Sequence, residues 1–494
     1  MAATSFFFIF FIHFFLLVNS ISCKQIRPEL DPIRLARSGL LHAMKWADQG
    51  LKEMKRVDQE EGLDGHDYVG KMVLGDCLKV YGDCEPKVEK LVFGKDYSYD
   101  DEVAWINGVM ANHRSCLDGL EEMGMVFYDH EKVIGNLTFL LDDALVSLKK
   151  QRNRKPMRKR FPRTNTDGGL LASWNTGTSK ADIVVAQDGS GNYKTINDAV
   201  SALQKMNRPE RTIIYVKSGV YHENVEIKKN LKNLMFVGDG MDKTIVTGNK
   251  NVPDGSTTYG SATFGISGDG FWARDMTFEN TAGPEKHQAV ALRVSSDLSV
   301  FYRCSFKGYQ DTLFVHSFRQ FYRECHIYGT IDFIFGDAAV VFQNCDIFVK
   351  KPMNHQSPMI TAQGRDNSNQ NTGISIINCR VLPSSEFKDV KGNFKSYLGR
   401  PWKKYSRTVF LKTDLDGLVD PRGWSEWSGD FALSTLYYGE YKNSGDGAST
   451  ANRVKWPGFH VLHEDHEASP FSVANFIQGH YWIPSTGISF SAEI

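Results

Sequence analysis

A short motif recurs in the second half of the chain at a nearly constant spacing. The hexapeptide Phe301–Phe306 is repeated, with changes, at residues 322–327, 342–347 and 376–381, and each copy has cysteine at its fourth position. The first three copies are 21 and 20 residues apart. A unit this short cannot bury its own apolar face, so its repeats must stack into a solenoid. The copies are rich in strand-forming residues, which predicts a parallel β-helix that begins near residue 182.

Stacking places equivalent positions of successive turns about 4.8 Å apart. Cys304, Cys325, Cys345 and Cys379 then form a column, and cysteines at this separation can be joined by a disulfide. A column of free, buried thiols fits the same spacing, so both alternatives stay open. Residues 272–277 are a looser copy of the motif, with Asp275 expected at the cysteine position.

The 21-residue step also superposes Asp311 on Asp332, and Phe314 on Phe335. Two carboxyl groups stacked on consecutive turns cannot both ionise easily, so their pKa values should separate. A protonated acid beside a carboxylate is the arrangement that acid–base or nucleophilic catalysis needs. Gln310 adds an uncharged hydrogen-bond donor beside them. The alternative is a purely structural stack on the surface of the solenoid.

Residues 30–149 have the 3.6-residue periodicity of helices. Segments near residues 35–47, 69–81, 106–120 and 133–148 each carry an apolar face, which predicts an up-and-down four-helix bundle. Cys77 and Cys116 lie on the apolar faces of the second and third segments, so we expect either a disulfide or two buried thiols. Cys84 and Cys23 have no evident partner. The segment contains no catalytic cluster, which favours a binding or inhibitory role.

The charges balance overall, with 58 basic and 58 acidic residues, but they are unevenly distributed. Residues 1–148 carry 15 basic and 24 acidic side chains, whereas residues 149–163 carry nine basic and no acidic ones. We therefore expect an extended basic linker over residues 150–175. The cluster Arg158, Lys159 and Arg160 predicts cleavage by a processing protease, with an uncut, solvated linker as the alternative.

The N-terminus has the features of a secretory signal. Residues 6–18 are apolar except for His13, and small polar residues follow, which predicts a signal peptide over residues 1–22. The run is too short to cross a bilayer comfortably, and an uncleaved anchor is the alternative. A secreted chain can form disulfides and can be glycosylated at the sequon of Asn136. We expect an extracellular protein that meets no nucleic acid, and no membrane after signal removal.

Other chemistries lack support in the sequence. No G-x-S-x-G string is present, which argues against a serine hydrolase. No grouping of His, Cys, Asp and Glu has the spacing of a metal site, so we expect neither a metal nor another cofactor.

Five strings occur in order along the large C-terminal block: GVYHE at 219–223, QAVAL at 288–292, QDTL at 310–313, DFIFG at 332–336 and LGRPW at 398–402. In these strings the chain resembles plant pectin methylesterases that carry an N-terminal inhibitor-like pro-region. The resemblance implies an all-β, right-handed parallel β-helix as the catalytic domain, residues 180–494. It also implies an all-α four-helix-bundle pro-domain before it, residues 30–149. The implied activity is that of a pectinesterase, which hydrolyses methyl esters of homogalacturonan to pectate and methanol and so modifies the plant cell wall.

The resemblance also implies catalytic roles. Asp332 corresponds to the nucleophile that attacks the ester carbonyl. Asp311 corresponds to the general acid that protonates departing methanol and then serves as base for water. Gln310 and Gln288 correspond to amide donors around the developing oxyanion. Arg400 corresponds to the guanidinium that orients Asp332 and keeps it ionised.

Substrate contacts are implied for Thr258 and Trp402, together with Gln288 and Arg400. The resemblance also favours a Cys325–Cys345 disulfide. Two features depart from the family pattern: an additional cysteine pair near the start of the pro-region is missing, and so is the usual Arg-Arg/Lys-Leu-Leu processing string.

The implied partners are methyl-esterified homogalacturonan, a proteinaceous pectin methylesterase inhibitor and a processing protease, and the protein is expected to be a monomer. Two other functions stay open. One is a β-helical hydrolase or lyase that cuts the same polymer, because carboxylate pairs also cleave glycosidic bonds. The other is a non-catalytic inhibitor or regulator of esterases.

Overall fold

The structure, a computed structural model, describes residues 31–61, 68–122, 124, 130–151, 169–208 and 210–494. The predicted signal peptide, Cys23 and the cluster Arg158, Lys159 and Arg160 lie outside these residues. Within the described part, no helix is both long enough and apolar enough to cross a membrane.

The N-terminal part of the described chain is a bundle of four long helices, in which α2 and α4 each pack against both α3 and α5. The predicted apolar face of the last segment is buried at Leu137, Leu141, Ala144, Leu145 and Leu148. A disulfide between Cys77 and Cys116 joins the second and third helices. Of the two alternatives that the sequence left open, a disulfide or two buried thiols, the disulfide is therefore confirmed. The helices are α2 (Pro32–Glu61), α3 (Tyr68–Phe93), α4 (Tyr99–Glu122) and α5 (His130–Lys150).

The remainder is a β-helix whose strands form three parallel sheets. The 11-stranded sheet contains β1 (Ile183–Val185), β2 (Thr212–Val216), β5 (Leu234–Val237), β8 (Trp272–Arg274), β11 (Ser299–Tyr302), β14 (Arg319–Arg323), β17 (Ala339–Gln343), β20 (Gly373–Ile377), β23 (Arg407–Leu411), β25 (Tyr437–Tyr441) and β26 (Phe459–Leu462). The 8-stranded sheet contains β3 (Gly219–His222), β6 (Thr244–Gly248), β9 (Thr277–Asn280), β12 (Ser305–Lys307), β15 (His326–Gly329), β18 (Asp346–Val349), β21 (Arg380–Pro383) and β24 (Asp414–Leu415). The 7-stranded sheet contains β4 (Val225–Ile227), β7 (Phe264–Ile266), β10 (Leu292–Val294), β13 (Leu313–Phe314), β16 (Ile334–Gly336), β19 (Met359–Gln363) and β22 (Tyr397–Gly399).

The strand register confirms the predicted repeat. Phe301 pairs with Tyr322, Tyr322 with Phe342, and Phe342 with Ile376. The rings of Phe301 and Tyr322 stack with centroids 4.8 Å apart, so the repeat builds a continuous column of aromatic packing inside the solenoid. Register also corrects one expectation: Phe301 pairs with Ala273, which puts Met276, not Asp275, at the cysteine position.

The prediction of a Cys325–Cys345 disulfide is wrong, because both residues are free, buried thiols in the structure. The cysteines of successive turns lie in one column inside the core, but no S–S bond joins Cys325 to Cys345. Each thiol donates to a carbonyl of the preceding turn instead: Cys325 Sγ lies 3.4 Å from the Phe301 oxygen, and Cys345 Sγ lies 3.6 Å from the Tyr322 oxygen. The structure therefore contains the column of free thiols that was the alternative.

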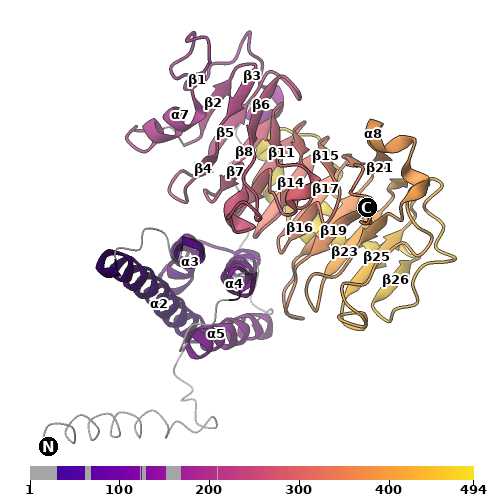
Figure 1. The fold of residues 1–494 in the computed structure, drawn as a ribbon, viewed down its shortest axis with the longest axis horizontal. Coiled ribbons are helices and arrows are strands. Elements are labelled where there is room, and N and C mark those ends of the chain that lie inside the picture. Colours follow the sequence, from indigo (N-terminus) through magenta and orange to yellow (C-terminus); the bar gives the residue numbers. More distant parts are fainter. Residues whose placement is uncertain (1–30, 62–67, 123, 125–129, 152–168, 209) are drawn as a thin grey trace, which may run out of the picture.

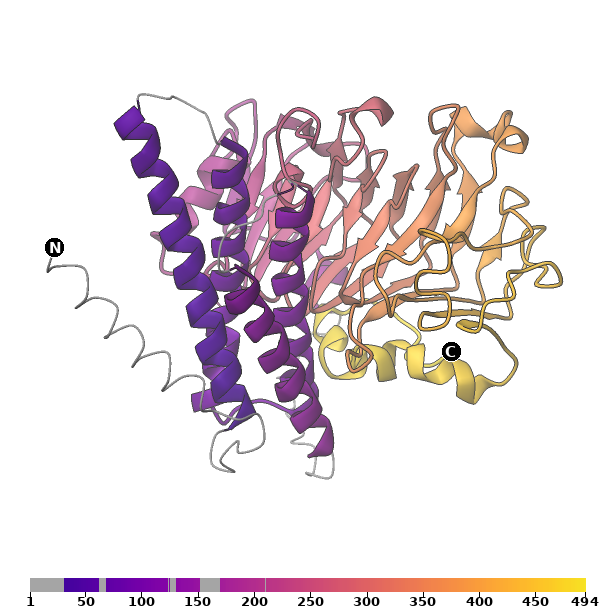
Figure 2. The same ribbon diagram turned by 60° about the horizontal axis from the view of Figure 1, so that its bottom comes forward.

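Two helical covers lie on the β-helix (Figure 1, Figure 2). The short C-terminal helices pack on the 11-stranded sheet through residues such as Phe471 and Trp482. The four-helix bundle packs on the 7-stranded sheet, where Phe314, Phe335 and Ala362 face it. Helix α7 is capped by Thr195, whose hydroxyl accepts from the Asp198 amide. The short helices are α6 (Leu170–Ser173), α7 (Ile196–Leu203), α8 (Ser385–Lys388), α9 (Asp465–Ala468), α10 (Val473–Phe476) and α11 (Gly479–Trp482).

Candidate active site

Asp311 and Asp332 lie at equivalent positions of consecutive turns, each two residues before a strand of the 7-stranded sheet. The Asp311 amide donates to the Ile331 carbonyl at 3.0 Å, which holds the two turns together at this point. Both aspartates have left-handed backbones, with φ of 63° and 51°, a conformation that aspartate tolerates better than most residues. Their residues are only 7% and 5% exposed. The stacking of the two carboxyl groups that the 21-residue step predicts is therefore present.

Arg400 holds the carboxylate of Asp332 from the end of β22. Its Nε donates to Oδ1 at 2.9 Å and its terminal nitrogen donates to Oδ2 at 2.6 Å. This two-point contact fixes the plane of the carboxylate as well as its position. The guanidinium carbon also lies 4.4 Å from the ring centroid of Trp427, which supports the arginine from its other side.

Asp311 is the member of the pair suited to hold a proton. Burial raises the pKa of its carboxyl well above the ordinary value, and the negative charges of Asp332 and Glu122 raise it further, while Arg400 opposes them. One carboxyl group is thus fixed by an arginine, and the surroundings of its neighbour favour the protonated form. The division of the pair into a carboxylate and an acid stays a prediction, which this arrangement supports.

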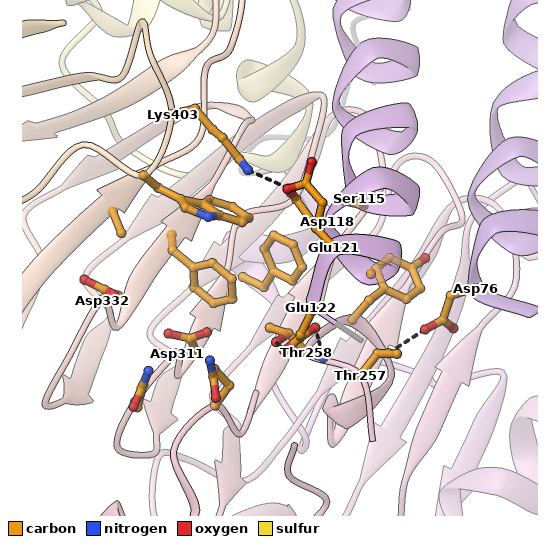
Figure 3. Close-up of a pocket in the computed structure, with 18 of the residues that line it drawn as sticks. Asp76, Ser115, Asp118, Glu121, Glu122, Thr257, Thr258, Asp311, Asp332 and Lys403 are labelled. Carbon is orange, nitrogen blue, oxygen red and sulfur yellow. Dashed lines mark hydrogen bonds and ion pairs between the residues drawn. The ribbon is translucent and has the colours of Figure 1, made fainter. Parts of the chain in front are cut away.

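The two aspartates open into a cavity of about 540 Å³ (Figure 3). All the predicted catalytic and substrate-contacting residues line it: Asp311, Asp332, Gln310, Gln288, Arg400, Thr258 and Trp402. Phe314 and Phe335 add a stacked aromatic wall with centroids 4.3 Å apart. The described residues contain no group of three or more His, Cys, Asp and Glu that could hold a metal.

Lys403 and Trp427, which flank Arg400 and Trp402 in the cavity wall, are among the lining residues that the sequence analysis missed. Lys403 directly follows the LGRPW string, and that adjacency was an available signal. Trp427 belongs to no recognised string, and its place beside Arg400 depends on the path of a long loop after β24.

The other half of the cavity wall comes from the helical bundle. Val73 and Asp76 of α3, and Ser115, Asp118, Glu121 and Glu122 of α4, line it. Glu122 accepts a hydrogen bond from the hydroxyl of Thr258 at 2.8 Å, and Asp118 forms an ion pair with Lys403 at 2.5 Å. Figure 3 shows these carboxylates on the same side of the cavity as the bundle, facing the two aspartates of the β-helix. The bundle thus closes the candidate site.

Buried polar contacts hold the bundle in this position. Lys87 of α3 is 8% exposed and forms an ion pair with Asp269 at 2.7 Å. Trp105 of α4 donates from its indole nitrogen to Asp297 at 3.0 Å. Such contacts favour one position of the bundle. If the bundle shifted on the β-helix, a buried charged group would lose its partner.

Close backbone packing adds to these contacts at Gly108 of α4. A Cβ atom at this position would lie 1.9 Å from the ring of Phe318, so only glycine permits the observed approach. Phe318 is itself 3% exposed and carries Lys87 over its ring. The helix therefore has little freedom to shift on the β-helix.

Asn136, the predicted glycosylation site, lies on the exposed side of α5, and its modification stays a prediction.

Comparison with known proteins gives a consistent result. Residues 182–480 match the family model described as Pectinesterase. The chain is 55% identical to a probable pectinesterase/pectinesterase inhibitor of Arabidopsis thaliana, over 98% of each chain. It is 54% identical to a pectinesterase of Citrus sinensis, over 80% of this chain and 76% of that protein. Among solved structures, pectin methylesterase from carrot matches with a TM-score of 0.63 and 52% identity, over 65% of this chain and all of the other.

Proposed function

Because the chain belongs to the pectinesterase family of carboxylic ester hydrolases, we propose that it hydrolyses the methyl esters of homogalacturonan and releases methanol. The observation that carries this proposal is the pairing of an arginine-held carboxylate with a buried acid. Arg400 fixes Asp332 through two hydrogen bonds, and Asp311 stands on the adjacent turn with a raised pKa. A nucleophile and a proton donor are the two groups that cleavage of a methyl ester requires.

In the first half of the reaction, Asp332 attacks the ester carbonyl carbon. The carbonyl electrons move onto the oxygen, and the amides of Gln310 and Gln288 donate to the resulting oxyanion. Asp311 gives its proton to the methoxy oxygen as the carbon–oxygen bond breaks. Methanol leaves, and the uronate acyl group stays bound to Asp332 as an anhydride.

In the second half, Asp311, now a carboxylate, takes a proton from water. The hydroxide adds to the uronate carbonyl carbon, and the bond to Asp332 breaks. Asp332 returns as a carboxylate held by Arg400, Asp311 is again protonated, and the product is a free uronic acid on the polymer.

The reaction products test this proposal against a chain-cutting enzyme. Methyl-esterified homogalacturonan should yield methanol with no increase in reducing ends. New reducing ends or unsaturated ends without methanol would support the hydrolase or lyase alternative instead.

The bundle has a second role in this proposal, as an inhibitor of the site it covers. Glu122 accepts from the hydroxyl of Thr258, and Asp118 pairs with Lys403, so the docked bundle takes up polar groups of the cavity that a polymer would contact. Activity then requires that the bundle be displaced or removed, and the basic linker offers the place for a processing protease. Secretion to the cell wall, guided by the N-terminal apolar run, belongs to the same proposal.

Replacement of Arg158, Lys159 and Arg160 by glutamine is expected to trap the full-length form. The substitution removes the basic side chains that a processing protease would recognise and keeps the length of the linker. Immunoblots of the secreted protein against both parts of the chain would show a single long species. Secretion of the short form at the normal yield would rule this site out.

Docking of the bundle is expected to weaken as the pH rises. In the docked state, burial raises the pKa values of two carboxyl groups of the bundle, Asp76 and Glu122, above their ordinary values. A carboxyl group whose pKa is higher in the docked state favours docking fully below its undocked pKa, about 4. That contribution is lost as the pH rises through the docked pKa. Docking should therefore be tightest near pH 4 and looser toward neutral pH.

Gel filtration of the chain after linker cleavage, at a series of pH values, measures this effect. Asp76→Asn should flatten the profile, because asparagine keeps an acceptor for Thr257 but does not titrate. Glu226 acts in the opposite sense, since Arg293 and Lys79 lower its pKa although burial raises it. Its contribution is lost only as the pH falls below the ordinary range of glutamate. Tighter docking at neutral pH than near pH 4 would contradict this prediction.

A further inference from the structure

Lys403 is the basic side chain of the cavity that has no fixed partner within the β-helix. Among the described residues that line the cavity, Arg400 and Lys403 are the cations. Arg400 directs its Nε and one terminal nitrogen at Asp332. Lys403 pairs at 2.5 Å with Asp118, which belongs to the bundle. When the bundle leaves, Arg400 keeps its contact with Asp332, whereas Lys403 loses its contact with Asp118.

The surroundings of Lys403 hold its ammonium group in the cavity wall. Its side chain is 13% exposed, and its ammonium lies 4.9 Å from the ring centroid of Trp402. The acidic group that faces it from the β-helix is Asp366, which pairs with Arg114 of the bundle at 3.7 Å. Within the described part of the chain, no carboxylate of the β-helix lies within ion-pair distance of Lys403.

The contact with Asp118 shows that a carboxylate fits against Lys403 within the same cavity as the paired aspartates. A partly de-esterified polyuronate presents free carboxylates beside its methyl esters. An ammonium group attracts a carboxylate, whereas a neutral methyl ester offers it only a weak acceptor. Position and charge thus point to one class of ligand.

We propose that Lys403 is a specificity-determining residue, which binds the free carboxylate of an already de-esterified uronate unit near the ester under attack. This inference rests on the proposed esterase function. It makes Asp118 a stand-in for a substrate carboxylate in the docked state. It also predicts that the enzyme prefers esters next to existing free units, so that de-esterified units accumulate in blocks.

The test compares Lys403→Gln with Lys404→Gln, a neighbouring lysine that does not line the cavity. Both are made in the full chain carrying Gly108→Leu, which is expected to weaken docking of the bundle. The measurements are repeated on chains cut in the linker. The quantity measured is the ratio of kcat/KM for methanol release from half-esterified over fully esterified homogalacturonan. Lys403→Gln should lower this ratio about tenfold, the loss expected for one charge-assisted hydrogen bond. Lys404→Gln should leave the ratio as in the parent.

A second measurement uses a fully de-esterified oligogalacturonate as the probe. Its Kd should rise about tenfold in Lys403→Gln and should depend less on salt than in the parent. An unchanged ratio with an unchanged Kd would overturn the proposal, and so would an equal loss on both polymers, because that reports a role unrelated to the free carboxylate. If the Gly108→Leu chain without a further substitution releases no methanol from either polymer, the proposed esterase function is wrong. That outcome differs from one in which only the proposed role of Lys403 is wrong.

Discussion

Replacement of Asp332 by asparagine is expected to reduce methanol release at least about a thousandfold, which corresponds to a barrier increase of about 4 kcal/mol. Asparagine has nearly the shape of aspartate and can keep a hydrogen bond from Arg400, but its amide is a poor nucleophile. The polymer should therefore still bind while the chemical step fails. The assay is steady-state methanol release by the enzyme with its bundle displaced, together with equilibrium binding of homogalacturonan.

Asp337→Asn is the matched control for this substitution. Asp337 is also buried in the β-helix, where it accepts hydrogen bonds from Gln363 and Gln370, but it does not line the cavity. Asp337→Asn should lower the rate of methanol release less than tenfold. If Asp332→Asn retained more than about a tenth of the parent turnover, a barrier change below about 1.4 kcal/mol, the assignment of Asp332 as nucleophile would be wrong.

Asp311→Asn distinguishes the acid from the nucleophile. It should be nearly as damaging as Asp332→Asn for methyl esters, because methoxide is a poor leaving group without a proton donor. An ester of a more acidic alcohol needs less protonation, so Asp311→Asn should be less damaging with such a substrate. Equal losses with both esters would count against a role for Asp311 in protonating the leaving group.

Replacement of Gly108 by leucine is expected to raise the activity of the full-length chain by about 5- to 150-fold. The new side chain meets the ring of Phe318 where even a Cβ atom would lie at 1.9 Å, and overpacking of this kind costs about 1–3 kcal/mol. Phe318 is buried and cannot move aside easily, so the strain falls on the docked state. The readout is methanol release by the uncut chain, with denaturing gel electrophoresis of the assayed sample to confirm that the linker is intact.

Gly135→Leu supplies the control on another helix of the same bundle. A Cβ atom at Gly135 meets no atom within 4 Å, so leucine there should leave both docking and activity unchanged. Circular dichroism of both variants checks that the bundle stays helical. A Gly108→Leu chain that is undocked in solution yet no more active than the parent would contradict the inhibitory role of the bundle.

The fold of the solenoid followed from spacing because a parallel β-helix translates sequence distance directly into spatial position. Every residue of one turn lies beside its equivalent in the next, so a 21-residue step that aligns Phe314 with Phe335 also aligns Asp311 with Asp332. The four helical segments followed from their apolar periodicity for a similar reason, since one buried face defines a helix. Arg400 could not be found by spacing, because it lies 68 residues from Asp332, and only the family resemblance linked the two.

The sequence by itself determined that repeated turns stack, that two carboxyl groups meet and that an acidic helical block precedes them. These features depend on local periodicity, which the chain encodes directly. The tertiary structure decided whether stacked cysteines bond, because that choice depends on side-chain geometry that spacing does not encode. The thiols stay free, and Cys325 donates to the Phe301 carbonyl of the preceding turn. It also decided that α4 approaches Phe318 closely at Gly108 and that Asp118 pairs with Lys403. Such contacts join segments far apart in the sequence, and they produce no repeated pattern in either segment from which they could be predicted.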